Sequence, residues 1–134
     1  MVQPLASSVD HLGEIGTVVF DGEISHSFRK GPILAAGGGL VGGEYREDIS
    51  PVRAPDDVLA LVREASVAAT DHVRAMQWMG RDEELLYGRF DVVRLDDGSP
   101  ALLEAELFEP CFFLPTDPTA VDRFVTAVLA RVSV

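Results

Sequence analysis

The residues in this chain with the clearest chemical potential are three carboxylates on two neighbouring segments: Asp91, Glu104 and Glu106. Asp91 lies in a run rich in β-branched and aromatic residues, and the two glutamates lie in a second apolar run. The dipeptide Asp97-Gly98 separates the two runs and is typical of a tight turn. The sequence therefore predicts a β-hairpin with strands over 85–95 and 101–108.

The predicted hairpin brings the carboxylates to one face of a sheet, because side chains alternate between faces along a strand. With the turn centred on 97–98, Asp91 faces Glu104. In the same register, Arg89 faces Glu106. Directly opposed residues have Cβ atoms about 4.5–5.5 Å apart, so two facing carboxylates repel each other unless a cation lies between them. Carboxylate oxygens suit Mg²⁺ that also holds phosphates.

Two interpretations of this carboxylate group are open from the spacing alone. Charged residues at alternate strand positions are typical of a solvated sheet face, and a slip of one residue in the register would separate the side chains. The other interpretation is a Mg²⁺ site formed by Asp91, Glu104 and Glu106.

The carboxylate hairpin is one part of a predicted α+β fold. Another hairpin is predicted over 17–30, with Asp21-Gly22 at its turn. Apolar residues at helical spacing predict one helix over 55–79 and a last helix that begins at 116–118. The predicted buried stripe of the last helix consists of Val121, Phe124, Val125, Val128 and Leu129. This order of elements predicts an antiparallel sheet with helices packed on one face.

The organisation of the chain is predicted to be a single domain over 1–134, because this length suits one domain and no linker divides it. Between positions 31 and 51 lies a segment that is rich in glycine and has little periodicity. We expect this segment, 31–51, to be a flexible substrate loop or lid.

The composition restricts the partners of the protein. The chain carries a formal net charge of −11, which should repel the phosphate backbone of nucleic acids. No segment approaches the roughly 18 apolar residues that a membrane helix needs, and the first residues lack the basic and apolar parts of an export signal. One cysteine, Cys111, excludes an internal disulfide. We therefore expect a cytoplasmic protein that binds neither nucleic acid nor membrane.

The carboxylate hairpin resembles the C-terminal subdomain of the ATP-grasp ligases, the superfamily of bacterial glutathione synthetase and D-alanine–D-alanine ligase. That family places an aspartate on one strand and a Glu-x-Asn or Glu-x-Glu sequence on the next. Asp91, Glu104 and Glu106 match these positions, and Glu106 stands where many members have asparagine. The resemblance extends over nearly the whole chain, and the N-terminal half of the family has no counterpart in it.

The resemblance implies a site for Mg²⁺ and ATP. The metal ligands that it implies are Asp91, Glu104 and Glu106. The residues that it implies for nucleotide contact are Val2, Gln3, Pro4, Leu5 and Lys30, the first four through a hinge strand that contacts adenine. The catalytic residues that it implies are Lys30, Arg46 and Arg89.

The activity implied by the resemblance is that of a carboxylate–amine ligase that works through an acyl phosphate. Its partners would be a nucleotide, a small carboxylate and an amine, together with a missing N-terminal half or a second copy of the chain. The alternative is a truncated, non-catalytic ATP-grasp-like module for binding or assembly. A third reading is an unrelated acidic α+β interaction domain, in which the three carboxylates would not converge.

Overall fold

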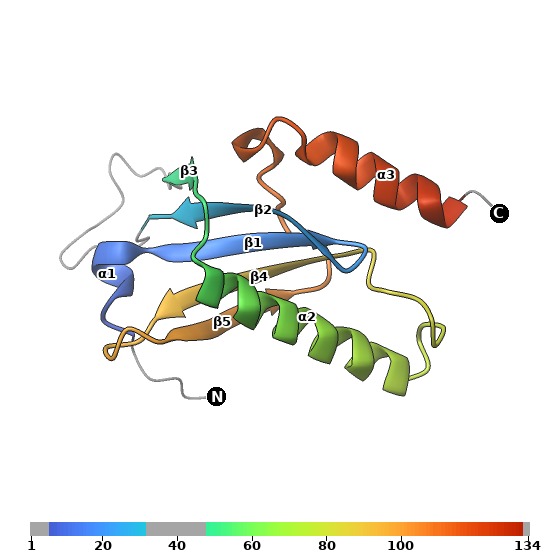
Figure 1. The fold of residues 1–134 in the computed structure, drawn as a ribbon, viewed down its shortest axis with the longest axis horizontal. Helices are drawn as coiled ribbons and strands as arrows, with labels where there is room; N and C mark the ends of the chain where they lie inside the picture. Colours follow the sequence, from blue (N-terminus) through green and yellow to red (C-terminus); the bar gives the residue numbers. More distant parts are fainter. Residues whose placement is uncertain (1–5, 32–47, 133–134) are drawn as a thin grey trace.

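The computed structural model describes residues 6–31 and 48–132, which form one antiparallel sheet with helices (Figure 1). The residues expected to contact adenine, which are Val2, Gln3, Pro4 and Leu5, lie outside the described residues. Arg46 and most of the predicted glycine-rich loop also lie outside them.

The sheet has the strand order β3-β2-β1-β4-β5, and every neighbouring pair is antiparallel. The long strands are β1 (Glu14–Phe20), β2 (Glu23–Lys30), β4 (Tyr87–Arg94) and β5 (Pro100–Glu106). Two hairpins, β1–β2 and β4–β5, meet through the pairing of β1 with β4. This arrangement confirms the predicted α+β class with an antiparallel sheet, and it puts β4 in the interior, where both of its faces are covered.

One face of the sheet is covered by α2 (Asp56–Ala75) (Figure 1). The core on this face is aliphatic and aromatic: Val58 and Val62 of the helix are fully buried against Phe90 and its neighbours on the strands. The sequence predicted that the helix would continue to Met79. It ends earlier because Gln77 has a left-handed backbone with φ of 61°, which no regular helix accommodates.

The opposite face carries a second cluster, to which α3 (Ala120–Val132) and the 3₁₀-helix η1 (Leu114–Thr116) contribute. Phe20 lies at its centre, with its ring centroid 5.2 Å from that of Phe112 and 5.1 Å from that of Phe124. The β1–β2 half of the sheet is therefore enclosed by α2 on one side and by α3 on the other.

The predicted buried stripe of the last helix is largely wrong. Val121, Val125 and Leu129 are 49%, 46% and 53% exposed, whereas Ala120 and Ala127 are buried. The helix has apolar residues around most of its circumference, so the helical spacing of apolar residues could not show which side of the helix packs against the sheet. Ala127 lies in the aromatic cluster, and Phe124 of the predicted stripe also packs against that cluster.

Two short elements were not predicted. β3 (Ile49–Pro51) pairs with Phe28–Lys30 of β2, so the last three residues of the expected loop form an edge strand instead. The pairing gives the outer edge of β2 partners for its backbone groups. A four-residue helix, α1 (Val9–Leu12), precedes β1. Among the described residues, no helix is long and apolar enough to cross a lipid bilayer.

Candidate functional site

The pairing of β4 with β5 places Asp91 opposite Glu104 and Arg89 opposite Glu106, as the sequence predicted. The turn itself differs from the prediction. It has three residues, because the N–H of Leu95 donates to the carbonyl of Ser99, the carbonyl of Leu95 accepts from the N–H of Gly98, and Gly98 adopts a left-handed φ of 83°. This longer turn shifts the register by one residue near its tip.

A β-bulge restores the expected register further along the hairpin. Val92 pairs with Leu102 and Asp91 pairs with Glu104, so Leu103 is the extra residue of the bulge. A bulge re-aims the side chains that follow it. The bulge therefore brings Glu104 and Glu106 to the face that holds Asp91, which is the face opposite α2.

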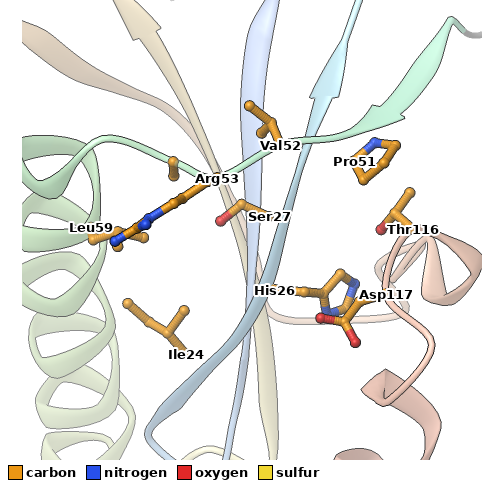
Figure 2. Close-up of a pocket in the computed structure, with 10 residues that line it drawn as sticks. Ile24, His26, Ser27, Pro51, Val52, Arg53, Leu59, Thr116 and Asp117 are labelled. Atoms are coloured by element: carbon orange, nitrogen blue, oxygen red, sulfur yellow. The ribbon is translucent and has the colours of Figure 1, made fainter.

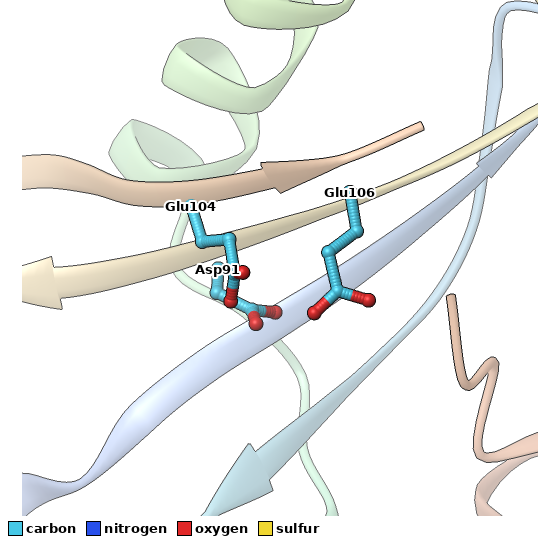
Figure 3. A group of neighbouring side chains, drawn as sticks. All are labelled: Asp91, Glu104 and Glu106. Carbon is cyan, nitrogen blue, oxygen red and sulfur yellow. The ribbon is translucent and has the colours of Figure 1, made fainter. Parts of the chain in front are cut away.

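The three carboxylates converge on one region of this face (Figure 3). One oxygen atom from each of Asp91, Glu104 and Glu106 lies within 4.8 Å of the other two. Asp91 is completely buried, Glu106 is half-buried and the Glu104 side chain is 53% exposed. The group thus has a buried base and an open rim, and a small ligand can approach it from the Glu104 side.

Two cations hold the buried base of this group. The Nζ atom of Lys30 lies 2.5 Å from Asp91 Oδ2 and 3.3 Å from the carboxylate of Glu14. The guanidinium of Arg89 donates to Asp91 at 2.9 Å through Nη2 and at 3.1 Å through Nε, and it also pairs with Glu106. Asp91 is therefore shared by two cations, which offset the cost of burying a charged group.

The pKa values of the two cations follow from these contacts. Burial lowers the pKa of Lys30, but the hydrogen bond and the charge of Asp91 outweigh burial and raise it. Burial lowers the pKa of Arg89 in the same way, and Asp91, Glu106 and Glu104 together raise it. Both groups stay charged at neutral pH, so neither can act as a general base there.

A glycine makes room for the buried aspartate. A Cβ atom at Gly16 on β1 would lie 2.9 Å from Asp91 Oδ1 and 2.5 Å from the ring of Phe28. Real Cβ atoms do not approach other atoms so closely, so any side chain at this position would displace the carboxylate or the ring. The position of Asp91 is thus set by three strands and not by its hairpin alone.

The donor set fits a divalent metal ion. Four carboxylates, those of Glu14, Asp91, Glu104 and Glu106, surround two cations, which leaves two negative charges in the group. Mg²⁺ prefers hard oxygen ligands and keeps several positions for water or phosphate. The charge of the group and the open side at Glu104 both suit such an ion.

Sequence reasoning missed one member of this group, Glu14. It lies at the start of β1, and no motif marks it. Its contact with Lys30 depends on the pairing of Glu14 with Lys30 across β1 and β2, which only the register reveals. The carbonyl of Cys111, which accepts a hydrogen bond from Arg89 at 3.2 Å, was missed because any residue offers a backbone carbonyl.

A separate cavity of about 400 Å³ opens beside His26, at the outer edge of β2 (Figure 2). Its walls include Ile24, Val52, Arg53, Thr116 and Asp117. Hydrogen bonds from the hydroxyl and backbone of Thr119, helped by Arg123, lower the pKa of Asp117 to about 2, so this carboxylate is ionised. None of the three converging carboxylates lines this cavity.

No family model matches the chain. The structure does align with a crystal structure of D-alanine–D-alanine ligase from Bacillus anthracis, with a TM-score of 0.50 at 15% identity, over 88% of this chain and 40% of that one. This likeness concerns the fold. Together with the relative described next, it confirms that the chain has the α+β fold of part of an ATP-grasp ligase.

In sequence, the chain is similar to DcsG, a cycloserine biosynthesis protein of Streptomyces lavendulae, with 35% identity over 131 residues. The crystal structure of the D-cycloserine synthetase DcsG aligns over 96% of this chain, with a TM-score of 0.82 and 34% identity. The chain spans only about two fifths of DcsG, 42% by sequence and 41% by structure. In length and fold it therefore corresponds to one part of that protein.

Proposed function

We propose that this chain is the catalytic C-terminal part of an ATP-dependent carboxylate–amine ligase that works through an acyl phosphate. The observation that carries this proposal is the convergence of Asp91, Glu104 and Glu106 on one sheet face, beside Lys30 and Arg89. The similarity to the D-cycloserine synthetase DcsG supports it, because that enzyme too has an ATP-grasp-like fold.

In this proposal, Asp91, Glu104 and Glu106 hold Mg²⁺. The metal ion, when bound, neutralises the negative oxygens of the nucleotide phosphates. The buried position of Asp91 and its two cationic partners fix the inner side of the site, while Glu104 at the rim is free to turn toward a ligand. The site therefore combines a buried carboxylate, Asp91, and a second one held by Arg89, Glu106, with a third at the rim that can adjust, Glu104.

Lys30 and Arg89 have the electrostatic role in the proposed reaction. Each carries a permanent charge close to the carboxylates, so each can attract phosphate oxygens without a change of protonation. Arg46 belongs to the same proposal as a third catalytic cation, and Val2, Gln3, Pro4 and Leu5 as the contact to adenine. No protein nucleophile is required, because positioning and charge supply most of the catalysis in phosphoryl transfer.

The proposed chemistry has two steps. A substrate carboxylate oxygen attacks the γ-phosphorus of ATP, the bond to the β-phosphate oxygen breaks, and ADP leaves. An amine nitrogen then attacks the carbonyl carbon of the acyl phosphate, inorganic phosphate leaves and the nitrogen loses a proton. Both steps move negative charge among phosphate oxygens, which is the charge that the cations and the metal ion are placed to stabilise.

The proposed partners follow from the size of the chain relative to DcsG. We propose that a further protein part, either the missing N-terminal half of the fold or a second copy of this chain, closes the site over the nucleotide. The small carboxylate and the amine would bind in the closed site. We place this assembly in the cytoplasm, where ATP and Mg²⁺ are available.

The experiment that tests this proposal is a calorimetric titration of the chain with ADP, with and without Mg²⁺. We expect Mg²⁺-dependent binding with a Kd of about 1 mM or tighter, and Glu104→Gln should weaken it at least tenfold. Glu64→Gln, which removes an exposed charge on α2, is the matched control and should bind like the wild type. A folded chain that gives no Mg²⁺-dependent heat would instead support the non-catalytic module.

A further inference from the structure

A short segment between β5 and η1 lies on the same face as the carboxylates and contacts their arginine. This segment, residues 110–113, offers two successive backbone carbonyls to side chains on the sheet. The carbonyl of Cys111 accepts a hydrogen bond from Arg89 Nη1 at 3.2 Å. The carbonyl of Phe112 lies 2.8 Å from His26 Nε2. Residues 110–113, which we call the crossing segment, are thus bound by one side chain from β4 and one from β2.

The partners of His26 define its tautomer. A carbonyl oxygen can only accept, so Nε2 carries the proton and donates it to Phe112. The other ring nitrogen, Nδ1, lies 2.9 Å from the hydroxyl of Ser25, which also accepts a hydrogen bond from Arg123 Nε at 2.9 Å. In neutral histidine Nδ1 accepts the hydroxyl proton of Ser25. One directed chain of hydrogen bonds therefore runs from α3 to the crossing segment.

The surroundings of His26 favour this neutral form. The residue is only 6% exposed, and its ring lies between those of Phe20 and Phe28, with centroids 6.4 Å and 6.3 Å away. Burial is the main cause that lowers the pKa of His26. It outweighs the hydrogen bond to the carbonyl of Phe112, which raises that pKa, while the nearby charges of Asp117 and Arg123 act in opposite directions. His26 is therefore neutral at pH 7 and can keep donating to Phe112.

The aromatic side chains of the crossing segment are anchored in the same place. The ring of Phe112 packs against Phe20 and Tyr87 at centroid distances of 5.2 Å, and the ring of Phe113 lies 4.6 Å from that of Phe28. Such packing buries the segment but does not select which way its carbonyls point. The hydrogen bond from His26 supplies that direction.

From this arrangement we propose that His26 is a positioning residue for Arg89. It fixes the carbonyl of Phe112, which in turn holds the neighbouring carbonyl of Cys111 toward Arg89. With that contact in place, the guanidinium fork is held at the carbonyl, at Asp91 and at Glu106 at once. The inference rests on the proposed function in one respect, which is that the orientation of Arg89 matters for a ligand at the carboxylates.

The first test needs no ligand. In the unliganded chain, NMR should show His26 as the neutral tautomer with the proton on Nε2, and it should report the solvent exchange of the Arg89 Nε proton. We expect His26→Phe, which keeps an aromatic ring, to speed this exchange roughly tenfold, which corresponds to the loss of about one hydrogen bond. His26→Gln should restore most of the protection, because its amide can donate to Phe112.

Two further variants make this test decisive. His72→Phe changes an exposed histidine on α2 and should leave the Arg89 exchange unchanged. Ser25→Ala leaves the imidazole in place and removes the partner of Nδ1, so it should speed the exchange less than His26→Phe does. If His26→Phe does not fold, the Arg89 exchange rate in Ser25→Ala still tests the inference. Unchanged Arg89 exchange in both His26→Phe and Ser25→Ala, or a proton on Nδ1 in the wild type, would overturn the inference.

The second test measures binding. In the titration with ADP and Mg²⁺, we expect His26→Phe to weaken binding roughly tenfold and His26→Gln to weaken it much less. If the wild type binds no nucleotide, the proposed function fails, and the exchange measurement still decides whether His26 positions Arg89. If the wild type binds and His26→Phe binds equally well, the positioning role for the site is wrong while the proposed function stands.

Discussion

The two faces of the central strand β4 differ sharply in chemistry although they are built from alternate residues. Phe90 and Val92 point toward α2 and lie in an apolar core with Val58 and Val62. The intervening Arg89 and Asp91 point to the opposite face, where they are equally buried and are tied to Lys30 and Glu106. Successive residues of β4 thus alternate between an apolar core and a cluster of paired charges.

This difference explains how the fold stays stable although it contains a buried group of charged side chains. Paired charges in an interior gain little net stability, because desolvation offsets most of their attraction. The apolar face with α2 contributes the burial that stabilises the sheet, so the charged face is free to hold groups for another purpose. Substitutions at neighbouring positions of β4 should therefore have effects of different kinds.

The largest effect is expected from Phe90→Ala on the apolar face. Removing a fully buried aromatic ring should lower the free energy of unfolding by about 3–5 kcal/mol. Denaturant unfolding should give this loss at both low and high salt, because no charge is involved. A loss that changed strongly with salt would show that the two faces are not independent.

Arg89→Met should cost nearly as much, for a different reason. It leaves the buried carboxylate of Asp91 with Lys30 as its remaining cation, which should cost about 3 kcal/mol. The double variant Arg89→Met, Asp91→Asn should recover part of that loss, and denaturant unfolding of the four proteins gives the coupling. Strictly additive losses would contradict the ion-pair account of this face.

Glu104→Gln should separate binding from stability. The side chain is 53% exposed, so the free energy of unfolding should stay within about 0.5 kcal/mol of the wild type. The same change should weaken Mg²⁺-dependent ADP binding at least tenfold, a loss of about 1.4 kcal/mol. Equal binding heats in the variant and the wild type would remove Glu104 from the metal site.

Lowering the pH should show how much the neutral form of His26 contributes to the free energy of unfolding. Burial lowers its pKa in the folded chain, so between pH 6.5 and the folded pKa the unfolded chain binds a proton that the folded chain does not. The contribution of His26 to stability is therefore complete above pH 6.5 and is lost as the pH falls. Denaturant unfolding at pH 7 and pH 5 should show a smaller drop for His26→Gln than for the wild type, and an equal drop would contradict a buried neutral histidine.

The smallest effect is expected from Leu129→Ala on the exposed side of α3. Leu129→Ala removes a side chain that is 53% exposed, so stability should change by no more than about 0.5 kcal/mol. Ala127→Leu, on the buried stripe of the same helix, should destabilise the chain by about 1–3 kcal/mol through overpacking. Thermal unfolding of the two variants tests which stripe of α3 faces the aromatic cluster.

The sequence predicted the elements of both hairpins and the convergence of the three carboxylates, because alternation along strands and two turn dipeptides are local signals. The pairing of Asp91 with Glu104 across the hairpin was predicted from a two-residue turn. It holds in the structure because a longer turn and the bulge at Leu103 shift the register in opposite directions. Such compensation depends on packing across the hairpin, and local patterns do not contain it.

Other features depend on contacts between distant segments. Glu14 joins the site through strand pairing, and β3 forms because β2 has an unpaired edge. The helical period of α3 did not predict its buried stripe, because apolar residues lie on more than one side of it. In each case the deciding interaction lies far away along the chain, so sequence periodicity could not supply it.

The central claim is that Asp91, Glu104 and Glu106 bind one divalent cation, and Mn²⁺ tests it most directly. Because Mn²⁺ binds carboxylate oxygens and broadens nearby NMR signals, a titration locates the ion without nucleotide. The account predicts the strongest early broadening for the amide signals of Gly16, Asp91 and Glu104, weaker broadening for Val62 on α2, and loss of this pattern in Glu104→Gln. Broadening that begins instead at exposed carboxylates such as Asp82 and Glu83, with Asp91 unaffected, would contradict it.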